Sequence, residues 1–167
     1  MNLATFSYDE VLEIAINIEK RGYELYTSAA KITKSDPAKN ILLFLADQEK
    51  GHEEIFRKLH KDVKEKGQNN SIKLSKESTE HLKSIADSSI FPADDEQFLE
   101  KVNTLDDIIK VAKQAEKDSI LFYVELSNYA PDEASEDFYK LIIQEEKEHL
   151  IKIQELDRVI KERGVVY

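Results

Sequence analysis

The sequence predicts an all-α fold, a four-helix bundle built from two helical hairpins with a long connection between them. Three observations lead to this prediction. Only 4 Gly and 3 Pro occur among 167 residues, so long stretches contain nothing that would break a helix. Four long segments place apolar residues at helical spacing. The first two of these segments also match the last two in sequence.

The first hairpin is expected over about residues 7–66. Its first helix opens with FSYDEV, in which Ser7 and Glu10 have the spacing of a capping box, and it continues to the turn TKSDP. Asp36 is expected to cap the second helix, with Pro37 at the first helical position. One face of this second helix, which should end near Gly67, is marked by Ile41, Leu45, Gln48, His52, Ile55 and Leu59.

Residues 67–103 are expected to form a crossover, because they contain too few apolar residues for a core of their own. Within them, SKESTEHLKSIADSSI could form a short helix. The second hairpin is expected over about residues 104–163, with helices at about 104–128 and 132–163 and a stop at Gly164. The whole chain, 1–167, is therefore predicted to be a single domain.

Composition narrows the range of partners. The formal charge of −10 disfavours nucleic acid and is compatible with cations. No apolar run approaches the roughly 20 residues of a membrane span, so no membrane association is expected. No secretory signal is visible at the N-terminus, which favours a cytoplasmic location. The absence of Cys excludes disulfides and thiolate metal sites.

An internal repeat is the most informative feature. A displacement of 97 residues places the first hairpin on the second without a gap. Chance similarity between two hairpins of equal length would be the simpler explanation, but the matches concentrate on residue types that can bind metal. The identical pairs include Glu19 with Glu116, Tyr26 with Tyr123, Glu49 with Glu146, His52 with His149, and Leu59 with Leu156.

The spacing also places four glutamates at one height. Glu19 and Glu49 each lie about 15 residues from the turn between them, hence at the same level at ~1.5 Å per residue. Glu116 and Glu146 are arranged in the same way around Pro131. All four lie on faces of apolar or small residues. Burying four carboxylates in one layer would cost several kcal/mol unless protons or cations neutralise them, and two divalent ions would balance their charge.

Each hairpin also contains Glu-x-x-His, which puts a carboxylate and an imidazole on one side of a helix. One such pair alone is usually an exposed salt pair. The two pairs, Glu49–His52 and Glu146–His149, together with two lone inward glutamates, instead favour a dinuclear metal site. Such ligands suit Fe, Mn or Zn. A Glu on each of two helices and Glu-x-x-His on the other two is the arrangement of ferritin-like di-iron carboxylate bundles.

The sequence resembles the ferritin-like superfamily, and most closely its rubrerythrin-like branch, in NIEKRGYELY, DQEKGHEEIF, AEKDSILFY and QEEKEHL. These segments lie in both hairpins. The resemblance implies two bound metal ions, with iron first and Mn or Zn as alternatives. The ligands that it implies are Glu19 and Glu116 as terminal carboxylates, Glu49 and Glu146 as bridging carboxylates, and His52 and His149 on one metal each.

The resemblance implies an oxidoreductase that reduces peroxide or O₂, or oxidises Fe²⁺, with no catalytic residue beyond the metal ligands. Rubrerythrins carry a four-cysteine rubredoxin-like domain, which is not present here, so an external electron donor is expected. They also usually carry a further glutamate where this chain has Ser119, so their redox-linked ligand shift is not implied. Iron storage with ferroxidase activity, or a non-catalytic bundle that binds Zn or no metal, stays open. Bundles of this type often form homodimers.

For four other residues the sequence leaves two possible roles open. Tyr26 and Tyr123 lie two turns beyond Glu19 and Glu116, where they either pack in the core or hydrogen-bond a ligand carboxylate. His60 and His81 are expected to be surface or structural residues.

Overall fold

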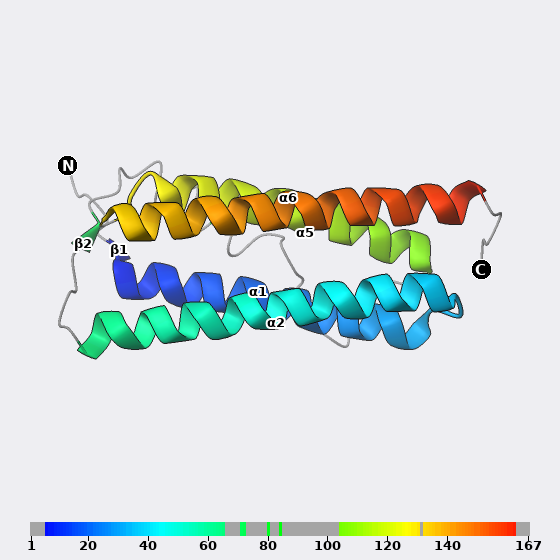
Figure 1. Cartoon of the computed structure of the whole chain (residues 1–167), viewed down its shortest axis with the longest axis horizontal. Helices are drawn as coiled ribbons and strands as arrows, with labels where there is room; N and C mark the ends of the chain where they lie inside the picture. Colours follow the sequence, from blue (N-terminus) through cyan, green and yellow to red (C-terminus); the bar gives the residue numbers. More distant parts are fainter. Residues whose placement is uncertain are drawn as a thin grey trace.

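The computed structural model of the chain describes residues 6–65, 71–72, 80, 84, 104–130 and 132–162. The described part forms an all-α four-helix bundle (Figure 1), which confirms the predicted fold class. Two strands of two residues each, β1 and β2, pair antiparallel beside it. The elements are β1 (Phe6–Ser7), α1 (Tyr8–Ile32), α2 (Asp36–Glu65), β2 (Ser71–Ile72), α5 (Leu105–Ser127) and α6 (Glu133–Glu162).

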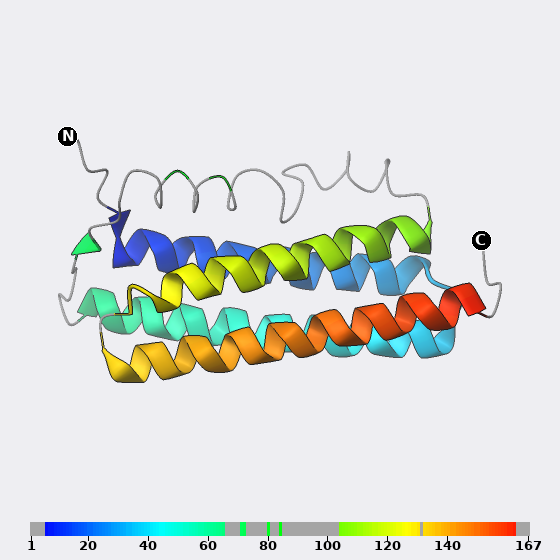
Figure 2. The same ribbon diagram turned by 90° about the horizontal axis from the view of Figure 1, so that it is seen from above.

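The helices form two antiparallel hairpins. Helix α1 packs along α2, and α5 packs along α6. The hairpins meet through contacts of α1 with α5 and of α2 with α6, and Figure 2 shows α5 running in the opposite direction to α1. The two halves of the sequence repeat therefore face each other across the centre of the bundle.

The buried face of α2 is rotated relative to the one marked in the sequence. Leu42, Leu45 and Phe56 are at most 1% exposed, whereas Ile55 is 46% exposed. The expectation that Ile55 shares the inward face was therefore wrong. The inward stripe of α2 centres instead on the residues that flank Glu49, because this face meets both α1 and α6.

The helix starts follow side-chain capping, with one correction. The hydroxyl of Ser35 accepts from the backbone N–H of Ala38 at 3.4 Å, and its carbonyl accepts from Lys39 at 2.8 Å. Ser35, and not Asp36, therefore caps α2, and Asp36 lies in the first turn, where its charge favours the helix dipole. At the start of α5, Thr104 accepts from the N–H of Asp107 at 3.2 Å.

Several expectations lie outside the described residues. These are the short helix in the crossover, the stop at Gly164, His81, and the capping side chain of Ser7. The single-domain organisation stays a prediction. In the described part of the chain, no helix combines the length and the apolar character that crossing a membrane would require.

Candidate metal centre

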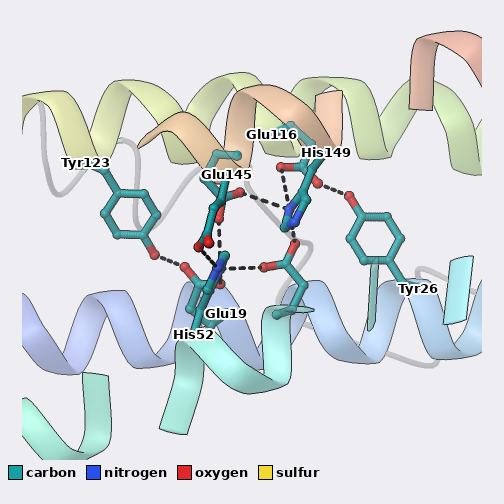
Figure 3. Close-up of polar contacts among 9 residues, drawn as sticks. Glu19, Tyr26, His52, Glu116, Tyr123, Glu145 and His149 are labelled. Atoms are coloured by element: carbon teal, nitrogen blue, oxygen red, sulfur yellow. Dashed lines mark hydrogen bonds and ion pairs between the residues drawn. The ribbon is translucent and has the colours of Figure 1, made fainter. Parts of the chain in front are cut away.

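Six polar side chains meet inside the bundle, midway along the helices (Figure 3). Each hairpin contributes one glutamate from its first helix and a Glu-x-x-His pair from its second helix. All six are at most 4% exposed, although the buried residues of the bundle are otherwise mostly apolar. They are Glu19 on α1, Glu49 and His52 on α2, Glu116 on α5, and Glu146 and His149 on α6.

These side chains form two overlapping groups, and within each group one potential ligand atom per residue lies within 4.8 Å of the others. The His52 group consists of Glu19, Glu49, His52 and Glu146. The His149 group consists of Glu49, Glu116, Glu146 and His149. Two glutamates therefore belong to both groups, and one glutamate and one histidine belong to each group alone.

The shared glutamates direct one oxygen to each imidazole. For His52, the Nδ1 atom lies 3.1 Å from Oε1 of Glu146 and 3.6 Å from Oε2 of Glu49. For His149, Nδ1 lies 3.7 Å from Oε2 of Glu146 and 3.5 Å from Oε1 of Glu49. The two rings are stacked with their centroids 5.6 Å apart. Both Nδ1 atoms thus face the same layer of carboxylates.

The other two glutamates each face one imidazole only. Oε2 of Glu19 lies 3.3 Å from Nδ1 of His52, and Oε2 of Glu116 lies 3.8 Å from Nδ1 of His149. The second oxygen of each accepts a hydrogen bond from a buried phenol of the opposite hairpin: Tyr123 donates to Glu19, and Tyr26 donates to Glu116. The tyrosines therefore do both things considered from the sequence, since they pack in the core and hold a carboxylate (Figure 3).

Gly22 leaves the room that Glu49 occupies. A Cβ atom built on Gly22 would lie 3.1 Å from Cγ and 3.2 Å from Cδ of Glu49. A side chain at position 22 would therefore press on a carboxylate that both groups share. Gly51, the other glycine in the interior of a described helix, has nothing within 4 Å of such a Cβ.

The four carboxyls differ in their protonation. Burial raises the pKa of Glu19 and of Glu116 well above the ordinary value, and repulsion from Glu146 and Glu49 raises it further. Burial also opposes ionisation of Glu49 and Glu146, but the facing imidazoles outweigh it and lower the pKa of both carboxyls. Without metal, the surroundings therefore favour the ionised form of Glu49 and Glu146 and the protonated form of Glu19 and Glu116.

The imidazoles complete this balance. Burial disfavours the charged form of His149, but interactions with Glu146 and Glu49 outweigh this and raise its pKa to about 9. The pKa of His52 is raised for the same reason, with burial opposing and Glu146 and Glu19 prevailing. Without metal, two imidazolium ions thus balance two carboxylates.

Protons alone do not give every buried polar atom of the layer a hydrogen-bond partner. Five buried atoms of it make no hydrogen bond within the described part of the chain: Oε2 of Glu19, Oε2 of Glu116, Oε1 of Glu146, and Nδ1 of His52 and of His149. A buried polar atom without a partner costs about 1–3 kcal/mol. All five belong to the His52 group or the His149 group. Oxygen and imidazole nitrogen donors arranged in this way fit two divalent transition-metal ions.

Glu145 is a further participant that the sequence did not single out. Its Oε2 atom lies 2.8 Å from Nε2 of His52, on the side of the ring opposite the layer. Glu145 is next to Glu146 and therefore points in a different direction from the inward face of α6. Its repeat counterpart is Gln48, so neither the helical period nor the repeat marks it as part of the site.

A third group of potential ligands consists of Asp9, Glu13 and His60. Nε2 of His60 lies 2.7 Å from Asp9. Lys64 lies 3.6 Å from Asp9 and 3.8 Å from Glu13, so a cationic side chain already offsets part of the negative charge of this group. His60 thus lies outside the central layer, and the expectation that it is a surface or structural residue stays a prediction.

Two comparisons with known proteins find a similarity to this chain. A family model described as Rubrerythrin matches residues 10–156. The chain is also similar to a solved structure from Thermotoga maritima, described as a candidate ferritin-like diiron-carboxylate protein, with 29% sequence identity and a TM-score of 0.74. This match covers 92% of the present chain and 96% of the other. A search of curated proteins finds no match.

Proposed function

Because the chain belongs to the rubrerythrin family of ferritin-like di-iron carboxylate proteins, we propose that it is an oxidoreductase with two metal ions in its central layer. The metal that we propose is iron. The proposed reactions are reduction of peroxide or O₂ with electrons from an external donor, or oxidation of Fe²⁺. We further propose that the protein acts in the cytoplasm.

One observation carries this proposal. The five buried ligand atoms that lack a hydrogen bond all belong to the His52 group and the His149 group. We propose that Glu49 and Glu146 bridge the two ions, since each directs one oxygen to each imidazole. The His52 group and the His149 group would then each hold one ion, with Glu19 and Glu116 as the terminal carboxylates.

A pair of iron ions in such a site supplies the one-electron steps that amino-acid side chains cannot perform. The chain contributes position and shielding. The phenols of Tyr26 and Tyr123 hold Glu116 and Glu19 at one oxygen and leave the other free toward the layer. Burial of all six ligands keeps bulk water away, so that charges in the layer interact strongly.

The decisive experiment is metal analysis of protein made in iron-sufficient cells, together with the optical spectrum after reduction and exposure to air. We expect two iron ions per chain and an oxo-bridged iron absorption, with peroxide or O₂ consumed when a chemical reductant is supplied. Protein that is folded but carries neither iron nor this absorption would refute the proposal. Size-exclusion chromatography separates a small oxidoreductase from a storage protein, which would elute as a large cage.

Removal of both proposed bridging carboxylates tests the ligand assignment. We expect Glu49→Ala with Glu146→Ala to lose nearly all bound metal, because each ion would lose two of its four protein ligands. The matched control is Glu54→Ala with Glu148→Ala, which removes two exposed carboxylates from the same two helices. Circular dichroism checks the fold of both variants. Metal content equal to that of the control would show that the assignment is wrong.

A further inference from the structure

The central layer is nearly symmetric, but one contact breaks the symmetry. Glu145 reaches Nε2 of His52, whereas the residue that the 97-residue repeat aligns with Glu145 is an amide, Gln48. We propose that Glu145 positions His52 and makes the His52 group the tighter of two unequal metal sites. This inference rests on the proposed two-metal function.

The geometry of His52 requires a particular proton arrangement for metal binding. Nδ1 faces Glu146, Glu19 and Glu49 at 3.1–3.6 Å, so this nitrogen must present its lone pair to a metal in the layer. The ring proton must then lie on Nε2. The carboxylate of Glu145, 2.8 Å away, accepts a hydrogen bond from this N–H and so favours the tautomer that can bind metal.

The partner of His52 is also charged. A hydrogen bond to a carboxylate is roughly twice as strong as one between neutral groups, and it makes the imidazole a better electron donor to a metal. The residue aligned with Glu145 in the first hairpin, Gln48, is uncharged, so the repeat provides no matching carboxylate for His149. The side chain of Glu145 is 37% exposed, so Glu145 approaches His52 from outside the buried layer.

The difference in affinity between the two metal sites should therefore appear when metal is added in steps. The first ion should enter the His52 group, where the imidazole is held in the required orientation, and the second should enter the His149 group. Loss of a side chain that orients a histidine ligand typically lowers metal affinity about 10–100-fold. Substitution of Glu145 should therefore weaken the first step by about this factor and bring the two steps closer together.

The experiment is a titration of the metal-free protein with Co²⁺, followed by visible absorption, for the wild type and three variants. We expect two unequal steps in the wild type. Glu145→Gln should weaken the tighter step about 10–100-fold, and Gln48→Glu should strengthen the weaker step. The matched control is Glu148→Gln, which removes an exposed carboxylate of α6 three residues away and should leave both steps within about twofold of the wild type.

A second measurement reports on the ring itself. In Zn²⁺-loaded protein with ¹⁵N-labelled histidine, the N–H of His52 should appear on Nε2, and its proton should move upfield in Glu145→Gln but not in Glu148→Gln. Equal effects of Glu145→Gln and Glu148→Gln would overturn the inference, because the effect would then be one of overall charge. Unchanged steps in Glu145→Gln would overturn it as well. Failure of the wild type to bind any metal would refute the proposed function itself, which is a distinguishable result.

Discussion

At the scale of single residues, the arrangement of the layer depends on which partner each of the two oxygens of a carboxylate contacts. Glu19 and Glu116 give one oxygen to a phenol of the opposite hairpin and turn the other inward. A carboxylate held in this way loses less freedom when it binds a metal, because one of its torsions is already restricted. The buried tyrosines therefore contribute to the site through orientation.

The matched substitutions Tyr26→Phe and Tyr8→Phe test this role. Tyr26→Phe removes the hydrogen bond to Glu116 and leaves the aromatic ring in the core, so metal affinity should fall about 10-fold and the metal spectrum should change. Tyr8→Phe removes a buried phenol that pairs with Tyr139 instead, so it should leave the spectrum unchanged. Co²⁺ titration and circular dichroism provide the measurements. An unaltered spectrum in Tyr26→Phe would assign this tyrosine to core packing alone.

At the scale of helices, the site depends on how closely α1 approaches α2. Gly22 lies in the interior of α1, where glycine costs about 1 kcal/mol relative to alanine. Its contact with Glu49 explains why the position has no side chain. Gly51 lies in the interior of α2 with open space around it, and the contacts of the described chain provide no physical reason for it.

The two glycines make a matched pair of substitutions. In Gly22→Ala the added methyl group must displace Glu49 by a few tenths of an ångström, so we expect metal affinity to fall severalfold. Gly51→Ala should raise the free energy of unfolding by up to about 1 kcal/mol, through helix propensity alone, and leave metal affinity unchanged. Denaturant unfolding and Co²⁺ titration measure the two quantities. Equal metal affinities in the two variants would show that the approach of α1 does not constrain Glu49.

At the scale of the whole molecule, the bundle encloses four carboxylates whose negative charge can be balanced by protons or by metal ions. Without metal, the raised pKa of Glu19, Glu116, His52 and His149 keeps protons in the layer. Metal binding must displace these protons, because a protonated imidazole or carboxyl cannot act as a ligand. The stability of the bundle and its metal affinity should therefore depend on pH in opposite directions.

The sign of the pH dependence follows from His149, whose pKa rises from about 6.5 to about 9 on folding. The stability that its proton contributes is fully present below pH 6.5 and is lost as the pH rises through 9. Metal-free protein should therefore melt at lower temperature as the pH is raised from 6.5 to 8.5, and added Zn²⁺ should stabilise it increasingly over the same range. Thermal unfolding with and without Zn²⁺ at several pH values tests this. A difference between the two melting temperatures that does not widen with pH would contradict it.

Much of the architecture follows from the sequence alone. Helical periodicity and the scarcity of breakers predict the four helices, and equal distances of the glutamates from the turns predict their common height. Both are local properties, because 1.5 Å per residue fixes position along a helix wherever it packs. The repeat then identifies Glu19, Glu49, His52, Glu116, Glu146 and His149 as one set, and the structure brings these six side chains together. Their individual ligand roles stay predictions.

Only the tertiary structure decides which side chains meet across helices. Tyr26 and Glu116 are 90 residues apart, Tyr123 and Glu19 are 104 apart, and His52 and Glu145 are 93 apart. No periodicity relates such partners, because the rotation of each helix about its axis is set by packing of whole faces. The same packing turns Ile55 outward and places Glu49 against Gly22. The sequence by itself therefore determined the height and composition of the layer, and helix packing decided its hydrogen bonds and its asymmetry.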